Sequence, residues 1–176
     1  MKYARLVIAY HGCTREVADA LLVGDATLSA STNDWDWLGH GIYFWEFGHQ
    51  RALDWARQRS DRPAVIGAVI QLTHCLDLLD IEHTQLLGNF TKRLVESGKP
   101  LPPNRGGRRE ADCFAINQLC TSAGEGGDPF DSVRASFHEG DEVFPGSGLR
   151  VRSHIQIAVR NPNIILGLFK PNDRNP

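Results

Sequence analysis

The stretch Leu38-Gly39-His40-Gly41-Ile42-Tyr43-Phe44-Trp45-Glu46 decides the fold when it is read with Tyr10-His11-Gly12 upstream. Each piece places an imidazole or a polar aromatic group at the edge of an apolar strand, with a glycine beside it. Glycine has no Cβ, so a second backbone or a ligand can approach closely there. Two such strand edges, about thirty residues apart, predict one flat pocket lined by His11 and Tyr43.

The composition is that of one globular domain over residues 1–176. Hydrophobic residues make up 41% of the chain and charged residues 23%, and this length supports a sizeable core. The formal net charge of -2 excludes a basic protein that coats nucleic acid, although a local basic patch is compatible with it.

The cysteines and the N-terminus favour a reducing compartment. Cys13, Cys75, Cys113 and Cys120 form no CxxC pair, so we expect free thiols. The histidines and cysteines do not follow zinc-finger spacing, and no metal site is expected. The apolar run at residues 6–10 is too short for a signal sequence, and no run reaches membrane-spanning length. The expected location is the cytoplasm, with no membrane partner.

The hydrophobic pattern predicts an α+β fold, with most helices before most of the later strands. Thr14 is the expected N-cap of the first helix, which ends near Gly24. A loop at 32–37 carries two tryptophans and is expected to fold over another part of the chain. A mobile basic loop is expected at 98–109. The predicted strands are 3–11, 41–45, 63–72, 132–138, 153–159 and 164–169, and the predicted helices are 15–22, 50–59, 82–96 and 110–123.

Three motifs resemble a known enzyme family. Tyr10-His11-Gly12-Cys13-Thr14 is similar to the opening His-Gly motif of the poly(ADP-ribose) polymerase and diphtheria-toxin-like ADP-ribosyltransferases. Leu38 to Phe44 resembles their G-x-G-I-Y-F strand, and Arg51-Ala52-Leu53-Asp54-Trp55 lies at nearly the distance of their K-S-A-N-Y-like segment. The resemblance covers the first sixty residues. It implies a split, curved sheet with flanking helices and NAD in the cleft between the halves.

The residue chemistry agrees with NAD as the donor substrate. His11 can donate from one ring nitrogen and accept on the other, which suits a ribose hydroxyl. The Gly12 backbone can pair with the carboxamide, and Tyr43 and Trp55 can sandwich the cationic nicotinamide, each contact contributing about 0.5–2 kcal/mol. In the competing interpretation, Tyr43 and Trp55 are ordinary core aromatics and His11 is a histidine at the end of a strand. The occurrence of all these residues in one ordered set favours the functional interpretation.

The family's third element is an acid at the start of a late strand, and Gln156 occupies the best matching position. Glutamine keeps a hydrogen bond but lacks the charge, and charge-assisted bonds are about twice as strong. This departure argues against chain elongation and for transfer of a single ADP-ribose. Glu139, in a glycine-containing turn, can supply the missing charge or activate an acceptor; it can equally be an exposed turn residue.

Other positions carry weaker expectations. The resemblance places Ser29 and Ser31 near the adenosine half of NAD and puts Ala52 where relatives have a serine. Arg134 can pair with the diphosphate, but a structural ion pair is the favoured alternative. The arginines of the basic loop (Arg105, Arg108 and Arg109) can meet phosphates of NAD or of a nucleic acid, or can be simply solvated. Cys13 lacks an identified base and is expected to be inert.

The sequence therefore predicts an NAD-dependent mono-ADP-ribosyltransferase that modifies a protein or a nucleic acid. The alternatives are an NAD glycohydrolase, a non-catalytic module that binds NAD or ADP-ribose, and an RNA 2′-phosphotransferase, which would need more basic contacts. A small transferase of this kind resembles toxins of toxin–antitoxin or phage-defence systems, which implies an antitoxin or immunity partner. The tryptophan loop and the basic loop are the expected acceptor-facing segments.

Overall fold

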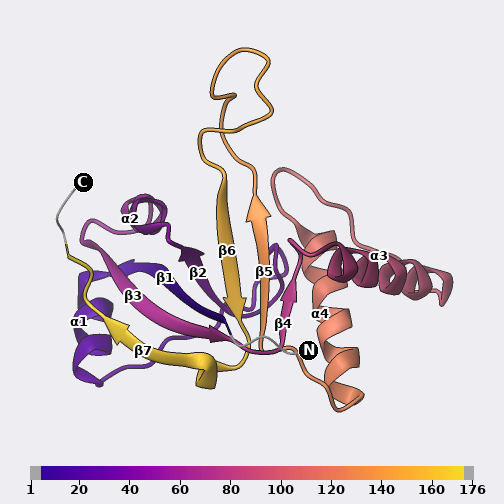
Figure 1. Ribbon diagram of the computed structural model, residues 1–176, viewed down its shortest axis with the longest axis horizontal. Helices are drawn as coiled ribbons and strands as arrows, with labels where there is room; N and C mark the ends of the chain where they lie inside the picture. Colours follow the sequence, from indigo (N-terminus) through magenta and orange to yellow (C-terminus); the bar gives the residue numbers. More distant parts are fainter. Residues whose placement is uncertain (1–4, 173–176) are drawn as a thin grey trace.

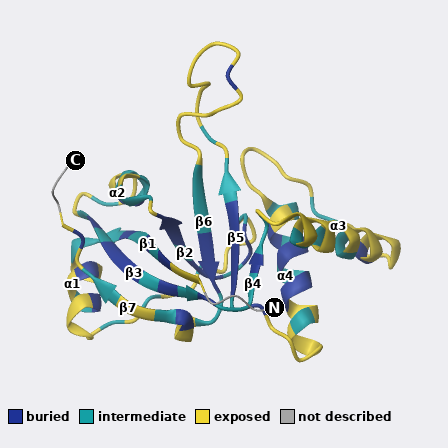
Figure 2. Cartoon of the chain, viewed as in Figure 1, coloured by how far each residue is buried: buried dark blue, intermediate teal, exposed yellow. Residues whose placement is uncertain are grey.

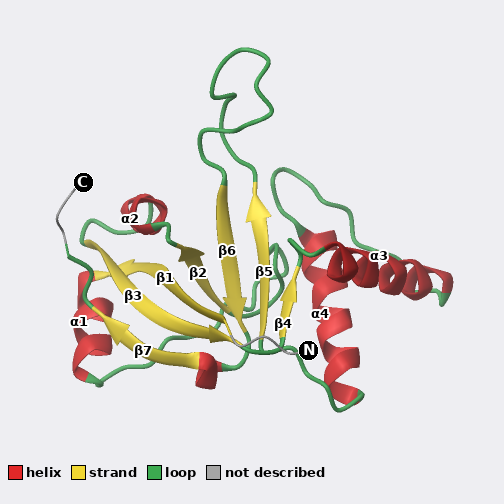
Figure 3. Cartoon of the chain, in the orientation of Figure 1, coloured by secondary structure: helices red, strands yellow, loops and turns green. Residues whose placement is uncertain are grey.

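A computed structural model describes residues 5–172, which have the expected α+β architecture (Figure 3). Within that range the elements are β1 (Arg5–Thr14), α1 (Arg15–Val23), β2 (Ile42–Glu46), α2 (His49–Arg57), β3 (Pro63–Leu72), β4 (Cys75–Asp77), α3 (Ile81–Glu96), α4 (Glu110–Glu125), β5 (Ser132–Phe137), β6 (His154–Val159), a 3-10 helix (Pro162–Ile164) and β7 (Ile165–Phe169).

The strands of these residues form one mixed sheet in the order β4-β5-β6-β2-β1-β3-β7 (Figure 1). Only β4 and β5 pair in parallel. β1 pairs with β3 along its whole length, but with β2 only at Ala9–Glu46 and Tyr10–Trp45. The sheet therefore opens between β1 and β2 from His11 onward.

The helices cover the two ends of the sheet. Thr14 caps α1 by accepting a hydrogen bond from the Val17 backbone, and Gly24 ends that helix with φ of 82°. α1 packs on β3, and α2 packs on β1 and β3. α4 buries a stripe that includes Cys113, Ile116 and Leu119 against the β4–β6 half, while α3 packs on α4 and buries only one of its residues. Figure 2 shows this contrast between the two helices.

The core has three parts. The largest joins apolar side chains of β1, β2, β3 and β6, such as Val7, Phe44, Ile70 and Ile157. A second lies under α4 and includes Leu38, and a third lies under α1. Leu38 is completely buried, so the chain just before β2 is anchored in the core.

The predicted elements are confirmed with shifted ends. β1 reaches Thr14 instead of residue 11, because β3 supplies partners that far; the predicted start at residue 3 lies outside the described residues. The helix predicted for 50–59 spans His49–Arg57. β4 was not predicted, since three residues carry too little periodicity. The chain at 138–153 is a long, mostly exposed loop that projects from the sheet (Figure 2).

The structure of residues 5–172 also bears on the cysteines and on membrane-spanning helices. All four cysteines are free thiols, as predicted. None of the helices in this range has the length and apolar character needed to cross a membrane.

Candidate functional site

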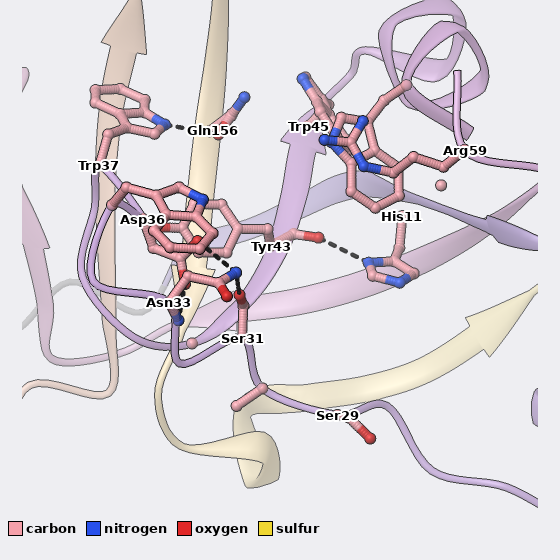
Figure 4. A pocket seen from close by; sticks show the side chains of 15 residues that line it. His11, Ser29, Ser31, Asn33, Asp36, Trp37, Tyr43, Trp45, Arg59 and Gln156 are labelled. Carbon is pink, nitrogen blue, oxygen red and sulfur yellow. Dashed lines mark hydrogen bonds between the residues drawn. The ribbon is translucent and has the colours of Figure 1, made fainter. Parts of the chain in front are cut away.

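A cavity of about 640 Å³ lies where β1 and β2 separate (Figure 4). It brings together most of the predicted site residues, from β1, β2, β6, the chain before β2 and the helix after it. The predicted residues that line it are His11, Gly12, Ser29, Ser31, Tyr43, Trp55 and Gln156. Glu139 is not among them.

His11 spans the opening in the sheet with its side chain. Continuing the β1–β2 register would place Gly12 opposite Tyr43. Instead, the His11 Nδ1–H donates to the Tyr43 carbonyl over 2.8 Å. Burial lowers the pKa of His11, although that bond opposes the shift. The imidazole is therefore neutral at pH 7, and its Nε2 remains an acceptor.

Gly12 is required first by the packing of α2. A Cβ on Gly12 would lie 2.2 Å from the carbonyl oxygen of Ala52. No side chain fits there, so glycine lets α2 approach β1 and at the same time leaves the Gly12 backbone as cavity wall. Ala52 is fully buried in this contact, which explains a small residue at that position.

Tyr43 contributes its ring to the cavity rather than a free hydroxyl. The hydroxyl accepts from the Leu38 N–H at 3.0 Å and donates to the Gly39 carbonyl at 2.7 Å. Burial raises the pKa of Tyr43, so the phenol stays protonated. These two bonds also fix the turn at Gly39, where φ is 75°.

Trp55 lies at the far side of the cavity with two neighbours that the sequence reasoning missed. The guanidinium carbon of Arg59 lies 4.1 Å from the centre of the Trp55 ring. Trp45 is tilted against Trp55 at 5.9 Å, and its indole N–H is buried without a partner among the described residues. Arg59 therefore places a cation in the cavity, and Trp45 leaves an unused donor beside it.

Gln156 is held from both ends of its amide. The Trp37 indole N–H donates to Oε1 at 2.8 Å, and Nε2 lies 2.9 Å from the His154 Nε2. Trp37 also packs on Phe137, with ring centres 4.8 Å apart. The tryptophan loop thus folds over this end of the cavity, as expected from its composition (Figure 4).

The same loop supplies a carboxylate. Asp36 accepts from the backbone and side chain of Asn33, and Asn33 in turn donates to the Ser31 hydroxyl. Among the described residues that line the cavity, Asp36 is the one acidic residue. Trp35 lies at the rim and is 43% exposed, with the Arg108 guanidinium 4.4 Å from its ring centre.

Glu139 and Arg134 make ion pairs outside the cavity. The Glu139 carboxylate lies 2.5 Å from Arg51 of α2 and 4.0 Å from Arg152. Buried Arg134 bonds Glu46 at 2.6 Å and Asp77 at 2.9 Å, which confirms the structural alternative and leaves it no diphosphate role.

The remaining expectations concern cysteine and metal. Burial raises the pKa of Cys13, so it stays a thiol and is a poor nucleophile, in agreement with the inert interpretation. Within residues 5–172, no cluster of three or more His, Cys, Asp or Glu side chains is arranged to hold a metal ion.

Besides the tryptophans of the loop, the cavity is lined by polar and aromatic residues that were not predicted from the sequence: Asn33, Asp36, Trp45 and Arg59. Asn33 and Asp36 belong to the tryptophan loop, which was already expected to fold over another part of the chain, and Trp45 lies within the stretch Leu38 to Glu46. Those three carried a usable signal. Arg59 lies just past α2 in a run of arginines, and nothing local distinguishes it from Arg57.

Comparison with known proteins gives one informative relative. An uncharacterized protein of the archaeon Methanocaldococcus jannaschii is 28% identical to this chain, over 94% of this chain and 86% of the relative. The similarity thus extends over nearly the whole of both chains, but the name assigns no activity. No family model and no solved structure matches.

Proposed function

We propose that the cavity binds NAD and that the protein is a mono-ADP-ribosyltransferase with an ADP-ribosyltransferase-like split sheet. The observation that carries the proposal is the neutral His11, bound to the Tyr43 carbonyl at the opening between β1 and β2. Its Nε2 acceptor, the Gly12 backbone and the Tyr43 ring share one cavity, in the order that the resemblance implies.

Each part of NAD has a matching group. His11 Nε2 accepts from a ribose hydroxyl, and the Gly12 backbone pairs with the carboxamide. The rings of Tyr43 and Trp55 flank the nicotinamide. Ser29 and Ser31 face the adenosine half, and Arg59 takes the diphosphate contact that Arg134 cannot make.

The reaction breaks the bond between nicotinamide nitrogen and ribose carbon, and the bonding electrons leave with neutral nicotinamide. The ribose carbon becomes electron-poor and is attacked by a nucleophile of the acceptor, which loses a proton. Gln156 presents an amide dipole to this centre, and Asp36 supplies the negative charge that glutamine lacks. Glu139, paired with Arg51 outside the cavity, is assigned to the acceptor rather than to the donor.

Incubation with NAD labelled in its adenylate part tests the proposal. We expect wild-type protein to label a macromolecule in a cell extract separated into protein, DNA and RNA fractions. His11→Ala and Tyr43→Ala should lose labelling, while Lys92→Ala, a change at an exposed position of α3, should keep it. Failure of the wild type both to bind NAD in calorimetry and to turn it over would refute the proposal.

A binding module is the second candidate, because both polar atoms of the Gln156 amide already have protein partners and neither carries a charge. Calorimetric NAD binding without release of nicotinamide would favour it. Release of free ADP-ribose without a labelled macromolecule would instead identify an NAD glycohydrolase.

The biological setting that we propose is a toxin or phage-defence effector acting in the cytoplasm, restrained by an antitoxin or immunity partner. Expression of the wild type should then arrest growth, whereas His11→Ala should not. Equal growth of both strains at equal protein level would contradict a toxin role.

A further inference from the structure

The Gln156 amide is the centre of a directional chain of hydrogen bonds. Trp37 Nε1–H donates to Gln156 Oε1 at 2.8 Å, and Gln156 Nε2 lies 2.9 Å from His154 Nε2. His154 Nδ1 lies 2.7 Å from the carbonyl oxygen of Arg152, which can only accept. Nδ1 therefore carries the hydrogen, and the neutral ring accepts from Gln156 at Nε2.

This chain permits only one orientation of the amide. Turning the Gln156 side chain over would set its NH₂ group against the Trp37 N–H and its oxygen against the lone pair of His154. Both contacts would then be repulsive. In the observed orientation, each amide atom keeps one unused position: a lone pair on Oε1 and a hydrogen on Nε2.

We propose that His154 is a positioning residue, which together with Trp37 fixes the direction of the Gln156 amide dipole across the cavity and releases it when the imidazole is protonated. A protonated ring would offer a second N–H donor where the Gln156 NH₂ group already points. The amide oxygen is directed toward Trp37 and the NH₂ group toward His154, so the protonated ring finds no acceptor without breaking the Trp37 bond. The inference rests on the proposed function where it concerns NAD.

The surroundings of His154 favour the neutral ring. It lies between Trp45 of β2 and Phe137 of β5, with ring centres 6.4 and 5.6 Å away. Burial lowers the pKa of His154; the Arg51 charge on α2 acts in the same direction, whereas Glu139 and the Arg152 carbonyl oppose it. The ion pair of Arg51 and Glu139 is thus the charged neighbour that tunes this residue.

NMR tests the chain without any ligand. In ¹⁵N-labelled protein at pH 7.5, the ring nitrogens of His154 should report a hydrogen on Nδ1 and none on Nε2. Titration down to the pH at which the His154 ring takes up its second hydrogen should shift the Gln156 side-chain amide signals in step with that ring. His138→Gln, at an exposed position outside this chain of bonds, should leave the coupled shift unchanged. A hydrogen on Nε2 at pH 7.5, or Gln156 signals that ignore His154, would overturn the proposal.

Calorimetry with NAD tests the positioning role. His154→Gln keeps an acceptor at similar reach but does not titrate, and His154→Leu removes the acceptor. Loss of one hydrogen bond corresponds to about two- to tenfold weaker binding. We expect the wild type to weaken by that factor, relative to His154→Gln, between pH 7.5 and the pH at which NMR shows the His154 ring protonated, and His154→Leu to be weak at both values. His11 also titrates, but equally in the wild type and in both variants.

The outcomes separate the two proposals. Equal pH dependence of NAD affinity in the wild type and His154→Gln would overturn the positioning role while leaving NAD binding intact. Absence of NAD binding in every variant, with the NMR coupling present, would overturn the proposed function and the positioning role for NAD. The conclusion that Trp37 and His154 orient the Gln156 amide would be unaffected.

Discussion

The two halves of the sheet are held together by different means. In the half formed by β1, β3 and β7, long backbone pairing is joined by close approaches at glycine: a Cβ on Gly12 would meet Ala52, and one on Gly67 would lie 2.3 Å from the Phe169 ring. In the half formed by β2, β6, β5 and β4, buried Arg134 of β5 pairs with Glu46 of β2 and Asp77 of β4, and the amide chain at Gln156 joins the tryptophan loop to β6.

The two walls of the cavity are therefore held in place by different interactions. Its β1 wall depends on shape, because His11 and Gly12 are placed by backbone bonds and by helix packing. Its β6 wall depends on side-chain polarity, because Gln156 is oriented by an indole and an imidazole. Substitutions that add volume should damage the first half, and changes of charge or pH should damage the second.

Arg134→Ala should give the largest loss of stability, in the second half. Among residues 5–172, it would leave Glu46 with Arg5 alone as a cation partner, and the Arg5 side chain is half exposed. Removing one member of a buried ion pair costs about 3–5 kcal/mol. Urea unfolding should show that loss, whereas Arg57→Ala, which breaks an exposed 3.6 Å pair with Asp54, should change stability by less than about 1 kcal/mol. Similar losses of stability in the two variants would contradict the conclusion that the buried ion pair stabilises this half of the sheet.

Gly12→Ala should be the next largest and should act in the first half. The new methyl would press on the Ala52 carbonyl, and overpacking of this kind costs up to about 3 kcal/mol. Gly88→Ala is the matched control: it lies within α3, where a Cβ meets nothing within 4 Å. Alanine there should stabilise by about 0.5–1 kcal/mol. The free energies of unfolding of the two variants, measured in urea, should therefore change in opposite directions. An unchanged free energy of unfolding for Gly12→Ala would mean that α2 shifts away from β1 at little cost.

Tyr43→Phe should have a moderate effect where the two halves meet. It keeps the ring but leaves the Leu38 N–H and the Gly39 carbonyl without their partner. The expected cost is about 1–2 kcal/mol of stability. NAD affinity, measured by calorimetry, should fall less than for Tyr43→Ala, because the stacking surface remains. Equal losses in the two variants would assign the contribution of Tyr43 to its hydroxyl.

The fold could be predicted to a large extent, because long periodic segments and glycine punctuation are local signals. Residues 63–72 and 110–123 are apolar in patterns that allow one interpretation each. β4 escaped prediction because its pairing with β5 is set by tertiary contacts.

The lining of the cavity was predictable where a motif and a strand edge coincided, as at His11 and Tyr43. Arg59 and His154 could not be found. Nothing local distinguishes Arg59 from Arg57, and the neighbours of His154 on β2 and β5 lie far from it along the chain. Glu139 lies in the loop before β6, where it pairs with Arg51 on α2 and does not line the cavity; the sequence alone could not show this long-range partner.

The smallest expected effect is on the pH dependence of stability, with one histidine in each half. Burial lowers the pKa of His11 and of His154 below the usual value of about 6.5. As pH falls through 6.5, the unfolded chain therefore takes up protons before the folded one, and stability decreases. Above that value both states are neutral at these rings, and neither contributes.

Unfolding free energies at pH 7.5 and 5.5 measure this effect, at no more than about 1.4 kcal/mol per unit of pKa difference. His11→Gln and His154→Gln should each flatten the dependence, because each removes one buried imidazole. Asp131 also has a lowered pKa, but as a carboxyl group it titrates well below this window. If His154→Gln flattens the dependence and His11→Gln does not, the pH-sensitive part of the cavity lies wholly in the β6 wall, and the contrast between the halves becomes sharper. A dependence that neither variant changes would place it on other histidines.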